Sequence, residues 1–305
     1  MSGLRLDPKG LVVFVGAGPG ADDLITVRGA RVIAEADIII WASSLVHPGI
    51  VADHKPGAEV IDSASIPLED LVPLYTRARD EKLLVARVHT GDPDIYGATA
   101  EQRDLCAQIG IPTETIPGIS AFSATAARVG AELTLPEVAQ SMILTRLEGG
   151  RTPMPEGEDL VSLARHRSTL CIFLSITLLS SIQRDLRAAG WREDAPILVV
   201  HKASWPGEEK IVRTTLADVK EACRQAKIVS QAMIIASPTI GARQWSTLTK
   251  SRLYDASFTH RFRRASEERL VDMAVGKLNP RSEIRVPEGQ TKTTSSDEAS
   301  DDNLQ

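Results

Sequence analysis

Cysteine and long apolar runs are scarce in this sequence, and each absence excludes a class of protein. The three cysteines, Cys106, Cys171 and Cys223, lie far apart and form no Cys-x-x-Cys pair. An odd number at this spacing argues against a disulfide framework and against a zinc site, so we expect three small, buried, apolar side chains. No apolar run approaches the roughly 18 residues that a membrane-spanning helix requires.

Signals for secretion and for metal binding are also missing. Residues 1–9 lack the basic and apolar regions of a secretory signal, which leads us to expect a cytoplasmic protein. The six histidines include no pair at the i, i+4 spacing that places two ligands on one face of a helix. We therefore expect no bound metal.

Aromatic residues and net positive charge are scarce too. Aromatic residues make up 4% of the 305 residues, and the formal net charge is −5. Few stacking platforms and a net negative charge argue against a nucleic-acid partner. With 43% hydrophobic and 25% charged residues, the chain has the composition of a globular protein that buries a substantial core.

Strand and helix signals alternate over residues 1–119, the first predicted domain. Residues 11–16 form a β-branched run that ends in glycine, and apolar residues recur at helical spacing over 24–36, where Asp22 or Asp23 can cap the helix. Further predicted strands are 37–41, 59–61, 83–89 and 112–116, and further predicted helices are 68–78, which Pro73 kinks or shortens, and 98–109, which Gly110 closes. This alternation predicts an α/β fold with a mainly parallel sheet.

A second α/β domain is predicted over residues 120–245. It opens with a small-residue helix, and the later elements are strands at 141–145, 169–174, 197–200 and 232–236, an amphipathic helix at 178–189, and a helix before the last strand that Thr215 can cap. Residues 246–305 form a predicted extension without strand signals. Within it, 253–275 can form a polar surface helix or an oligomer contact, and the composition from 277 onward predicts disorder.

Three glycine-containing loops follow predicted strands. GAGPG, residues 16–20, is similar to a dinucleotide-binding turn, but Pro19 removes one of the backbone donors that such a turn aims at a pyrophosphate. HTGDPDIYGA, residues 89–98, carries Asp92 and Asp94, whose carboxylates can accept hydrogen bonds, and PGISAFS, residues 117–123, leaves room for a ligand beside the backbone. Each loop alone is also consistent with a plain turn. Because parallel strands end at one edge of their sheet, we expect the loops to meet in a ligand site.

The order and spacing of GAGPG, HTGDPDIYGA and PGISA resemble those of the tetrapyrrole methylase family, over about residues 11–238. The resemblance implies two α/β domains, with the donor S-adenosylmethionine bound in the cleft between them, and a homodimer. Four further segments are similar to the group of that family that methylates carbon 11 of precorrin-4, or of cobalt-precorrin-4, in cobalamin biosynthesis. They are WASSLV (41–46), TLPEVAQSMILTR (134–146), RTPMPEGE (151–158) and HKASWPGEE (201–209).

The resemblance also implies a set of residues that contact the donor. Two departures limit it: the aspartate that often follows GAGPG is Ala21 here, and the residues after Trp245 have no counterpart in the family's core. The implied donor contacts are Pro19, Gly91, Asp92, Pro93, Ile95, Tyr96, Ser120, Ala121, Ser175 and Ala203.

The implied acceptor is a small-molecule tetrapyrrole with many carboxylates, which an acidic protein must meet with local cations. Arg146, Arg151 and Lys202 lie in the family-like segments and are our candidates, although each is also consistent with a solvated surface charge. Transfer from a sulfonium requires alignment and exclusion of water, with no covalent intermediate or metal, so no catalytic residue is assigned. His89 could assist proton loss, but a histidine at a strand end is more often simply hydrogen-bonded.

Several alternatives stay open from the residues alone. A methylase of the same fold could act on another ring carbon or on uroporphyrinogen, against which segment 134–146 argues. A ribosomal RNA methylase of this architecture is disfavoured by the acidity and the few aromatics. From other classes, GAGPG could belong to a dinucleotide-dependent oxidoreductase or to a non-catalytic nucleotide-binding module.

Overall fold

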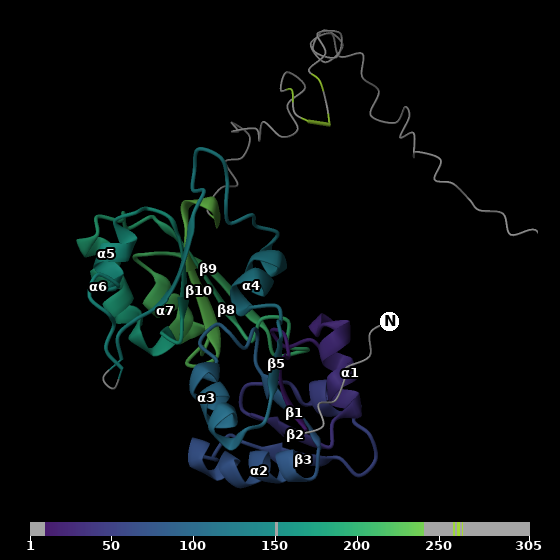
Figure 1. Ribbon diagram of the computed structural model, residues 1–305. Helices are drawn as coiled ribbons and strands as arrows, with labels where there is room; N and C mark the ends of the chain where they lie inside the picture. Colours follow the sequence, from purple (N-terminus) through teal and green to yellow (C-terminus); the bar gives the residue numbers. More distant parts are fainter. Residues whose placement is uncertain (1–9, 150–151, 241–258, 260, 263, 265–305) are drawn as a thin grey trace, which may run out of the picture. The chain divides into compact units, whose positions relative to one another are not determined.

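The computed structural model describes residues 10–149, 152–240, 259, 261, 262 and 264 (Figure 1). Contacts group residues 1–249 into one compact unit and 250–305 into another. Since both predicted α/β domains fall essentially within the first unit, the boundary between 119 and 120 stays a prediction. The predicted extension, with the segment 253–275, lies almost wholly outside the described residues.

The N-terminal lobe is built on an entirely parallel sheet. Its strands follow the order β3-β2-β4-β1-β5, and every pairing among them is parallel, as predicted. The strands are β1 (Leu11–Gly16), β2 (Ile38–Trp41), β3 (Glu59–Asp62), β4 (Leu84–His89) and β5 (Thr113–Ile116). β1 lies between β4 and β5, so the loops that follow these three strands leave the sheet side by side.

Helices cover both faces of this sheet (Figure 1). α1 (Val27–Glu35) packs on one face, and α2 (Val72–Asp80) and α3 (Thr99–Ile109) pack on the other. Successive side chains of β1 pack into the hydrophobic cores on opposite faces of the sheet: Val13 on the side of α1, and Phe14 on the side of α2 and α3. This double burial explains why the strand is a continuous apolar run without polar alternation.

The predicted cap of α1 is wrong, whereas the helix predicted over 68–78 is shortened close to Pro73, as expected. The hydroxyl of Thr26 caps α1 by accepting a hydrogen bond from the amide of Gly29 at 3.0 Å, whereas Asp22 and Asp23 lie in a preceding 3-10 turn. The predicted helix 68–78 is divided into a 3-10 turn, Leu68–Leu71, and α2. Pro73 then occupies the first turn of α2, where its missing amide costs nothing.

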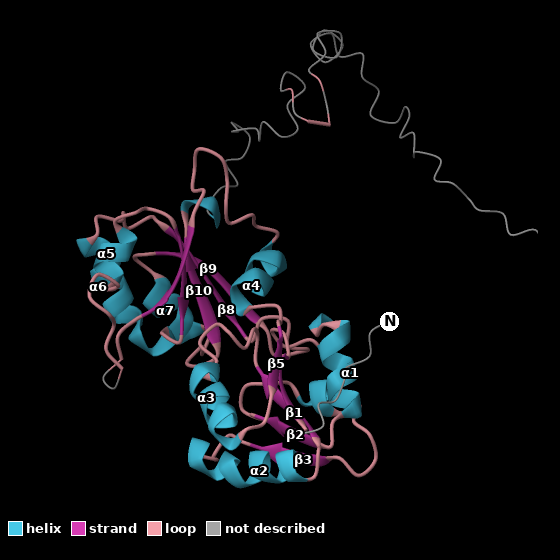
Figure 2. Ribbon diagram, in the orientation of Figure 1, coloured by secondary structure: helices cyan, strands magenta, loops and turns pink. Residues whose placement is uncertain are grey.

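The second lobe contains a mixed sheet with helices on both faces (Figure 2). Its order is β6-β7-β10-β8-β9, and only the β6–β7 pairing is parallel. The strands are β6 (Met142–Arg146), β7 (Thr169–Phe173), β8 (Pro196–His201), β9 (Lys210–Thr215) and β10 (Ala232–Ala236). Sequence reasoning missed β9, an edge strand whose residues KIVRTT are half-buried or exposed.

α4 covers one face of the mixed sheet, and three other helices cover the opposite face. The small side chains of α4 (Ala121–Val129), such as Ala124, pack closely on β8 and β10. Opposite lie α5 (Leu160–Ala164), which was not predicted, α6 (Leu179–Ala188) and α7 (Val219–Gln225). Thr215 belongs to β9, and α7 begins after Asp218, so the predicted Thr215 cap is wrong.

The cysteines follow the sequence prediction. Cys106, Cys171 and Cys223 are free and buried, and burial raises the pKa of their thiols to about 12, 12 and 11. Within the described part of the chain, no helix combines the length and the apolar character needed to cross a membrane.

Candidate active site

The three glycine loops meet at the carboxyl edge of the N-terminal sheet, as predicted. Gly18 and Gly91 exchange two backbone hydrogen bonds, at 2.8 and 3.2 Å, which join the loop after β1 to the loop after β4. The amide of Gly118, after β5, donates to the carboxylate of Asp92 at 3.1 Å. Side chain and backbone together therefore tie the three loops into one surface.

Glycine is required where these loops touch. A Cβ atom added at Gly118 would lie 2.1 Å from the carbonyl oxygen of Gly91, and one added at Gly16 would lie 2.5 Å from the Cα of Gly118. Contacts this short do not occur in real structures, so the backbones approach only because Cβ atoms are absent. The sequence analysis predicted room for a ligand beside the backbone of residues 117–123, whereas at Gly118 the neighbouring loops occupy that space.

A cavity of about 380 Å³ opens beside the loops and takes walls from both lobes. Its volume lies in the usual range for small-molecule sites, and most of its walls are apolar. Of the residues expected to contact the donor, Pro19, Ala121 and Ala203 line it, as do Thr90, Ile176 and Met233.

The other expected donor residues support the walls rather than line them. The carboxylate of Asp92 accepts hydrogen bonds from the amides of Asp94 and Gly118. Ser175 is fully buried, and its hydroxyl donates to the carbonyl of Phe173 at 2.6 Å and accepts from the amide of Leu147 at 2.8 Å. Both side chains are thus committed to the protein's own backbone.

The remaining expected donor residues lie on the same loops. Ser120 is buried at the start of α4, Pro93 is buried, and Ile95 donates its amide to the carbonyl of Asp92 at 3.3 Å. Tyr96 is 43% exposed, and its ring lies 5.1 Å from that of Phe173, a residue of the cavity wall. Tyr96 therefore connects the N-terminal loop to the second lobe.

Trp205 joins the lobes at the cavity, and sequence reasoning did not single it out. Its indole N–H donates to the carbonyl of Pro19 at 3.1 Å, and its ring lies against Gly20, where a Cβ would come within 2.1 Å of the ring. Beside it, the amide of Ala21 donates to the hydroxyl of Ser204 at 3.0 Å. Trp205 stands in the family-like segment HKASWPGEE, but only the fold shows that it meets GAGPG.

The candidate acceptor cations already have internal partners. The guanidinium of Arg146 donates to the carbonyls of Leu147, Thr152 and Pro153 at 3.1 to 3.3 Å. Lys202 is a lining residue of the cavity, and its ammonium pairs with Glu208 and lies 4.3 Å from the ring centroid of Trp205. Arg151 lies outside the described residues.

Backbone strain is concentrated around the site. Non-glycine residues with positive φ are rare because the left-handed region crowds the Cβ atom, and they persist where the surroundings fix them. Those at the loops and the cavity are Tyr96 (57°), Ala98 (49°), Leu174 (52°), Lys202 (46°), Ser204 (67°) and Gln231 (46°).

His89, at the end of β4, is a neutral side chain under the loops. Burial lowers its pKa to about 3, and the nearby charges of Arg87 and Arg103 act in the same direction. Among the described residues, its Nε2 atom is buried without a hydrogen-bond partner. This environment gives no support for a proton-transfer role, consistent with leaving His89 unassigned.

Comparisons with known proteins agree with this architecture. Residues 11–220 match the family model of the Tetrapyrrole (Corrin/Porphyrin) Methylases. The cobalt-precorrin-4 C(11)-methyltransferase of Priestia megaterium is 47% identical over 252 residues, 82% of this chain and 96% of that protein. The precorrin-4 C(11)-methyltransferase of Pseudomonas aeruginosa is 43% identical over 252 residues, 83% of this chain and 98% of that protein.

Two solved structures have a similar overall fold. The cobalt precorrin-4 methyltransferase CbiF has a TM-score of 0.74 and 45% identity, covering 78% of this chain and 99% of that one. Uroporphyrin-III C-methyltransferase from Thermus thermophilus, in complex with S-adenosylhomocysteine, has a TM-score of 0.64 and 25% identity, covering 76% of this chain and 99% of that one. The sheet order, the meeting glycine loops and these matches together show that the chain belongs to the tetrapyrrole methylase family.

Proposed function

We propose that this protein transfers a methyl group from S-adenosylmethionine to carbon 11 of precorrin-4 in cobalamin biosynthesis. The observation that carries the proposal is the identity to C(11)-methyltransferases, which extends over 96 and 98% of those relatives. The uroporphyrin-III methylase of similar fold is only 25% identical, which places the chain nearer to the precorrin-4 group.

The cavity between the lobes is the proposed donor site. Its volume of about 380 Å³ suits a ligand of this size, and its apolar walls suit the adenine ring, while the polar ends of the donor would meet backbone groups of the loops. The donor supplies a methyl group on a sulfonium, which leaves as S-adenosylhomocysteine. The proposed contacts are those expected from the sequence, and we assign Asp92 and Ser175 a backbone contact because internal hydrogen bonds occupy their side chains.

The residues of the chain orient the two substrates and exclude water. Holding reactants in line converts a bimolecular step into an effectively unimolecular one, which is a large part of catalysis for a reaction with a good leaving group. Trp205 and Ser204 close the second lobe onto residues 19–21, which limits access of water to the cavity. We assign no proton transfer to any residue.

The acceptor carboxylates are proposed to meet Arg146, Arg151 and Lys202. Arg146 also fixes the backbone at residues 152 and 153, and its guanidinium keeps further N–H groups beyond the three hydrogen bonds of the structure. Lys202 is a wall residue of the cavity in which the donor is proposed to bind, which supports its choice as an acceptor contact.

The deciding experiment is incubation with methyl-labelled S-adenosylmethionine and precorrin-4, followed by location of the new methyl group by NMR. We expect the label on carbon 11. The assay is run in parallel with cobalt-precorrin-4, because the names of the relatives include both acceptors. A label on another carbon identifies a different methylase of this fold, and calorimetric binding of NAD without binding of S-adenosylhomocysteine contradicts a methyltransferase.

We further propose that the protein acts as a cytoplasmic homodimer. Light scattering of the purified full chain tests the assembly: a mass twice the 33.0 kDa of one chain supports the dimer, and a mass of one chain contradicts it.

A further inference from the structure

The loop between β4 and α3 has a backbone that its own residues do not favour. Tyr96 and Ala98 both adopt positive φ, at 57° and 49°, and α3 starts after Ala98 without a side-chain cap. Left-handed geometry disfavours residues that carry a Cβ atom. Besides the hydrogen bonds within the loop, contacts from neighbouring elements are needed to fix this shape.

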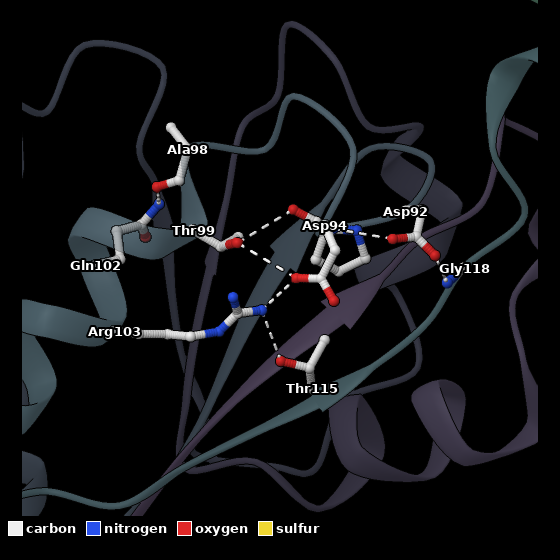
Figure 3. A network of polar contacts seen from close by, with 9 residues as sticks. Asp92, Asp94, Ala98, Thr99, Gln102, Arg103, Thr115 and Gly118 are labelled. Carbon is white, nitrogen blue, oxygen red and sulfur yellow. Dashed lines mark hydrogen bonds and ion pairs between the residues drawn. The ribbon is translucent and has the colours of Figure 1, made fainter. Parts of the chain in front are cut away.

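One face of α3 supplies these contacts, as Figure 3 shows. Thr99, Gln102 and Arg103 stand at spacings of three and four residues, which places them on the same side of the helix. Thr99 donates its hydroxyl to the carbonyl of Pro93 at 3.3 Å, and Gln102 donates to the carbonyl of Ala98 at 3.1 Å. These two bonds act at both ends of the strained segment.

Arg103 makes the contact with the middle of the loop. Its guanidinium pairs with the carboxylate of Asp94 and donates to the hydroxyl of Thr115 on β5 at 2.9 Å (Figure 3). It also lies 5.4 Å from the ring centroid of Phe14 on β1. Arg103 thus joins the loop to two strands of the sheet. Asp94 stands between Asp92 and Pro93 on one side and Ile95 and Tyr96 on the other, all of which belong to the proposed donor loop.

The ion pair is too exposed to be explained by stability alone. The side chains of Arg103 and Asp94 are 34% and 55% exposed, and exposed ion pairs contribute little to the free energy of unfolding. Arg103 is also fixed to the sheet by Thr115 and Phe14, so even a small free energy from the pair favours the observed shape of the loop that follows Asp94.

We infer that Arg103 is a positioning residue for the donor: through Asp94 it holds residues 91–96 in the shape that receives S-adenosylmethionine. The inference rests on the proposed function, which assigns that loop to the donor. Arg103 itself does not line the cavity.

The test compares Arg103→Met, which keeps the aliphatic stem, with the wild-type full chain. We expect the Kd for S-adenosylhomocysteine and the KM for the donor to rise about threefold to fivefold, the factor that an exposed ion pair can supply, while the KM for the tetrapyrrole changes less than about twofold. Arg103→Lys keeps the charge and recovers most of the affinity. Asp94→Asn raises the same two constants, and the double variant is no worse than Arg103→Met because both changes remove one interaction.

Arg187→Met is the matched control. Arg187 forms an exposed bidentate pair with Glu193 at 2.7 and 2.8 Å, far along the chain from the loop, and its loss leaves both constants at wild-type values. Wild-type affinity for S-adenosylhomocysteine in Arg103→Met, or an equal rise of both KM values, overturns the inference. If Arg103→Met does not fold, the Kd for S-adenosylhomocysteine and the KM for the donor measured in Asp94→Asn decide the inference. If the wild type itself binds no S-adenosylhomocysteine, the proposed function fails, whereas equal binding by wild type and Arg103→Met removes only the positioning role.

Discussion

At the scale of single residues, several polar side chains of the candidate site hold the protein's own backbone. Asp92 accepts two amide hydrogen bonds, Ser175 bridges Leu147 and Phe173, and Arg146 binds three carbonyls. Loops at strand ends leave amides and carbonyls without sheet partners, and burying them unpaired is costly. These side chains meet that need, so recognition of the donor falls to backbone groups and apolar walls.

His89 makes stability depend on pH. Its pKa is about 3 in the folded protein and near its ordinary value of 6.5 in the unfolded chain, so below pH 6.5 the unfolded chain binds a proton that the folded protein does not. The free energy of unfolding therefore falls as pH decreases from 6.5 towards 3, by up to about 1.4 kcal/mol per pH unit from this residue. Above pH 6.5 the contribution is complete and constant.

Urea unfolding of His89→Gln between pH 7 and 4 checks this expectation. In the variant, the free energy of unfolding should change less steeply with pH than in the wild type, by the equivalent of about one bound proton. His166→Gln, at an exposed histidine, is the control and should keep the wild-type slope. An unchanged slope in His89→Gln would show that His89 takes up its proton equally in both states.

At the scale of elements, the sequence predicts those helices and strands whose own residues show a clear apolar pattern. The apolar run of β1 and the amphipathic pattern of α6 identify both elements to within a residue or two. β9 was not predicted because an edge strand needs few apolar residues. The antiparallel pairing of the second sheet was not predicted either, because it depends on strands that are distant in the sequence. The glycine loops were predictable as a site because β1, β4 and β5 are parallel, but their direct contact was not.

Gly118→Ala tests that contact. The new Cβ would lie 2.1 Å from the carbonyl oxygen of Gly91 and 2.8 Å from the Cα of Gly16, so the strand-end loops must separate. We expect the free energy of unfolding to fall by about 1–3 kcal/mol, as for other overpacked sites. We also expect the affinity for S-adenosylhomocysteine, measured by calorimetry, to fall by about tenfold or more.

Gly149→Ala is the matched control for this change. A Cβ at Gly149 meets none of the described residues within 4 Å, and its φ is not positive, so both quantities should stay near wild type. If Gly118→Ala behaves like Gly149→Ala, the loops tolerate separation and the glycine contact is not what shapes the site.

At the scale of the whole described unit, a few cross-lobe contacts decide whether the cavity is closed. Trp205 binds the carbonyl of Pro19, Ser204 binds the amide of Ala21, and Gln231 donates to the carbonyl of Ser44. None of these pairs is visible in the sequence, because their members stand more than 180 residues apart. Donor affinity should therefore depend on pairings between residues that the sequence motifs alone do not show.

Trp205→Phe tests this dependence. The change leaves the carbonyl of Pro19 without its buried donor, which costs about 1–3 kcal/mol, and it loosens the closure over the cavity. We expect the Kd for S-adenosylhomocysteine to rise about tenfold, which corresponds to about 1.4 kcal/mol. Gly20→Ala should also raise the Kd for S-adenosylhomocysteine, because the new Cβ would displace the indole ring of Trp205 from its place against residue 20.

Trp191→Phe separates closure from a general loss of packing. Trp191 is as buried as Trp205, at 7% against 8% exposed, and its indole N–H donates to the carbonyl of Ala164 at 2.9 Å, a contact wholly within the second lobe. The two variants lose the same chemical group and a similar hydrogen bond, so urea unfolding should report similar destabilisation. Only Trp205→Phe should weaken donor binding, since only Trp205 spans the lobes. Equal donor affinity in the two variants would mean that the cavity forms without the cross-lobe contact, and donor binding would then have to be explained within one lobe.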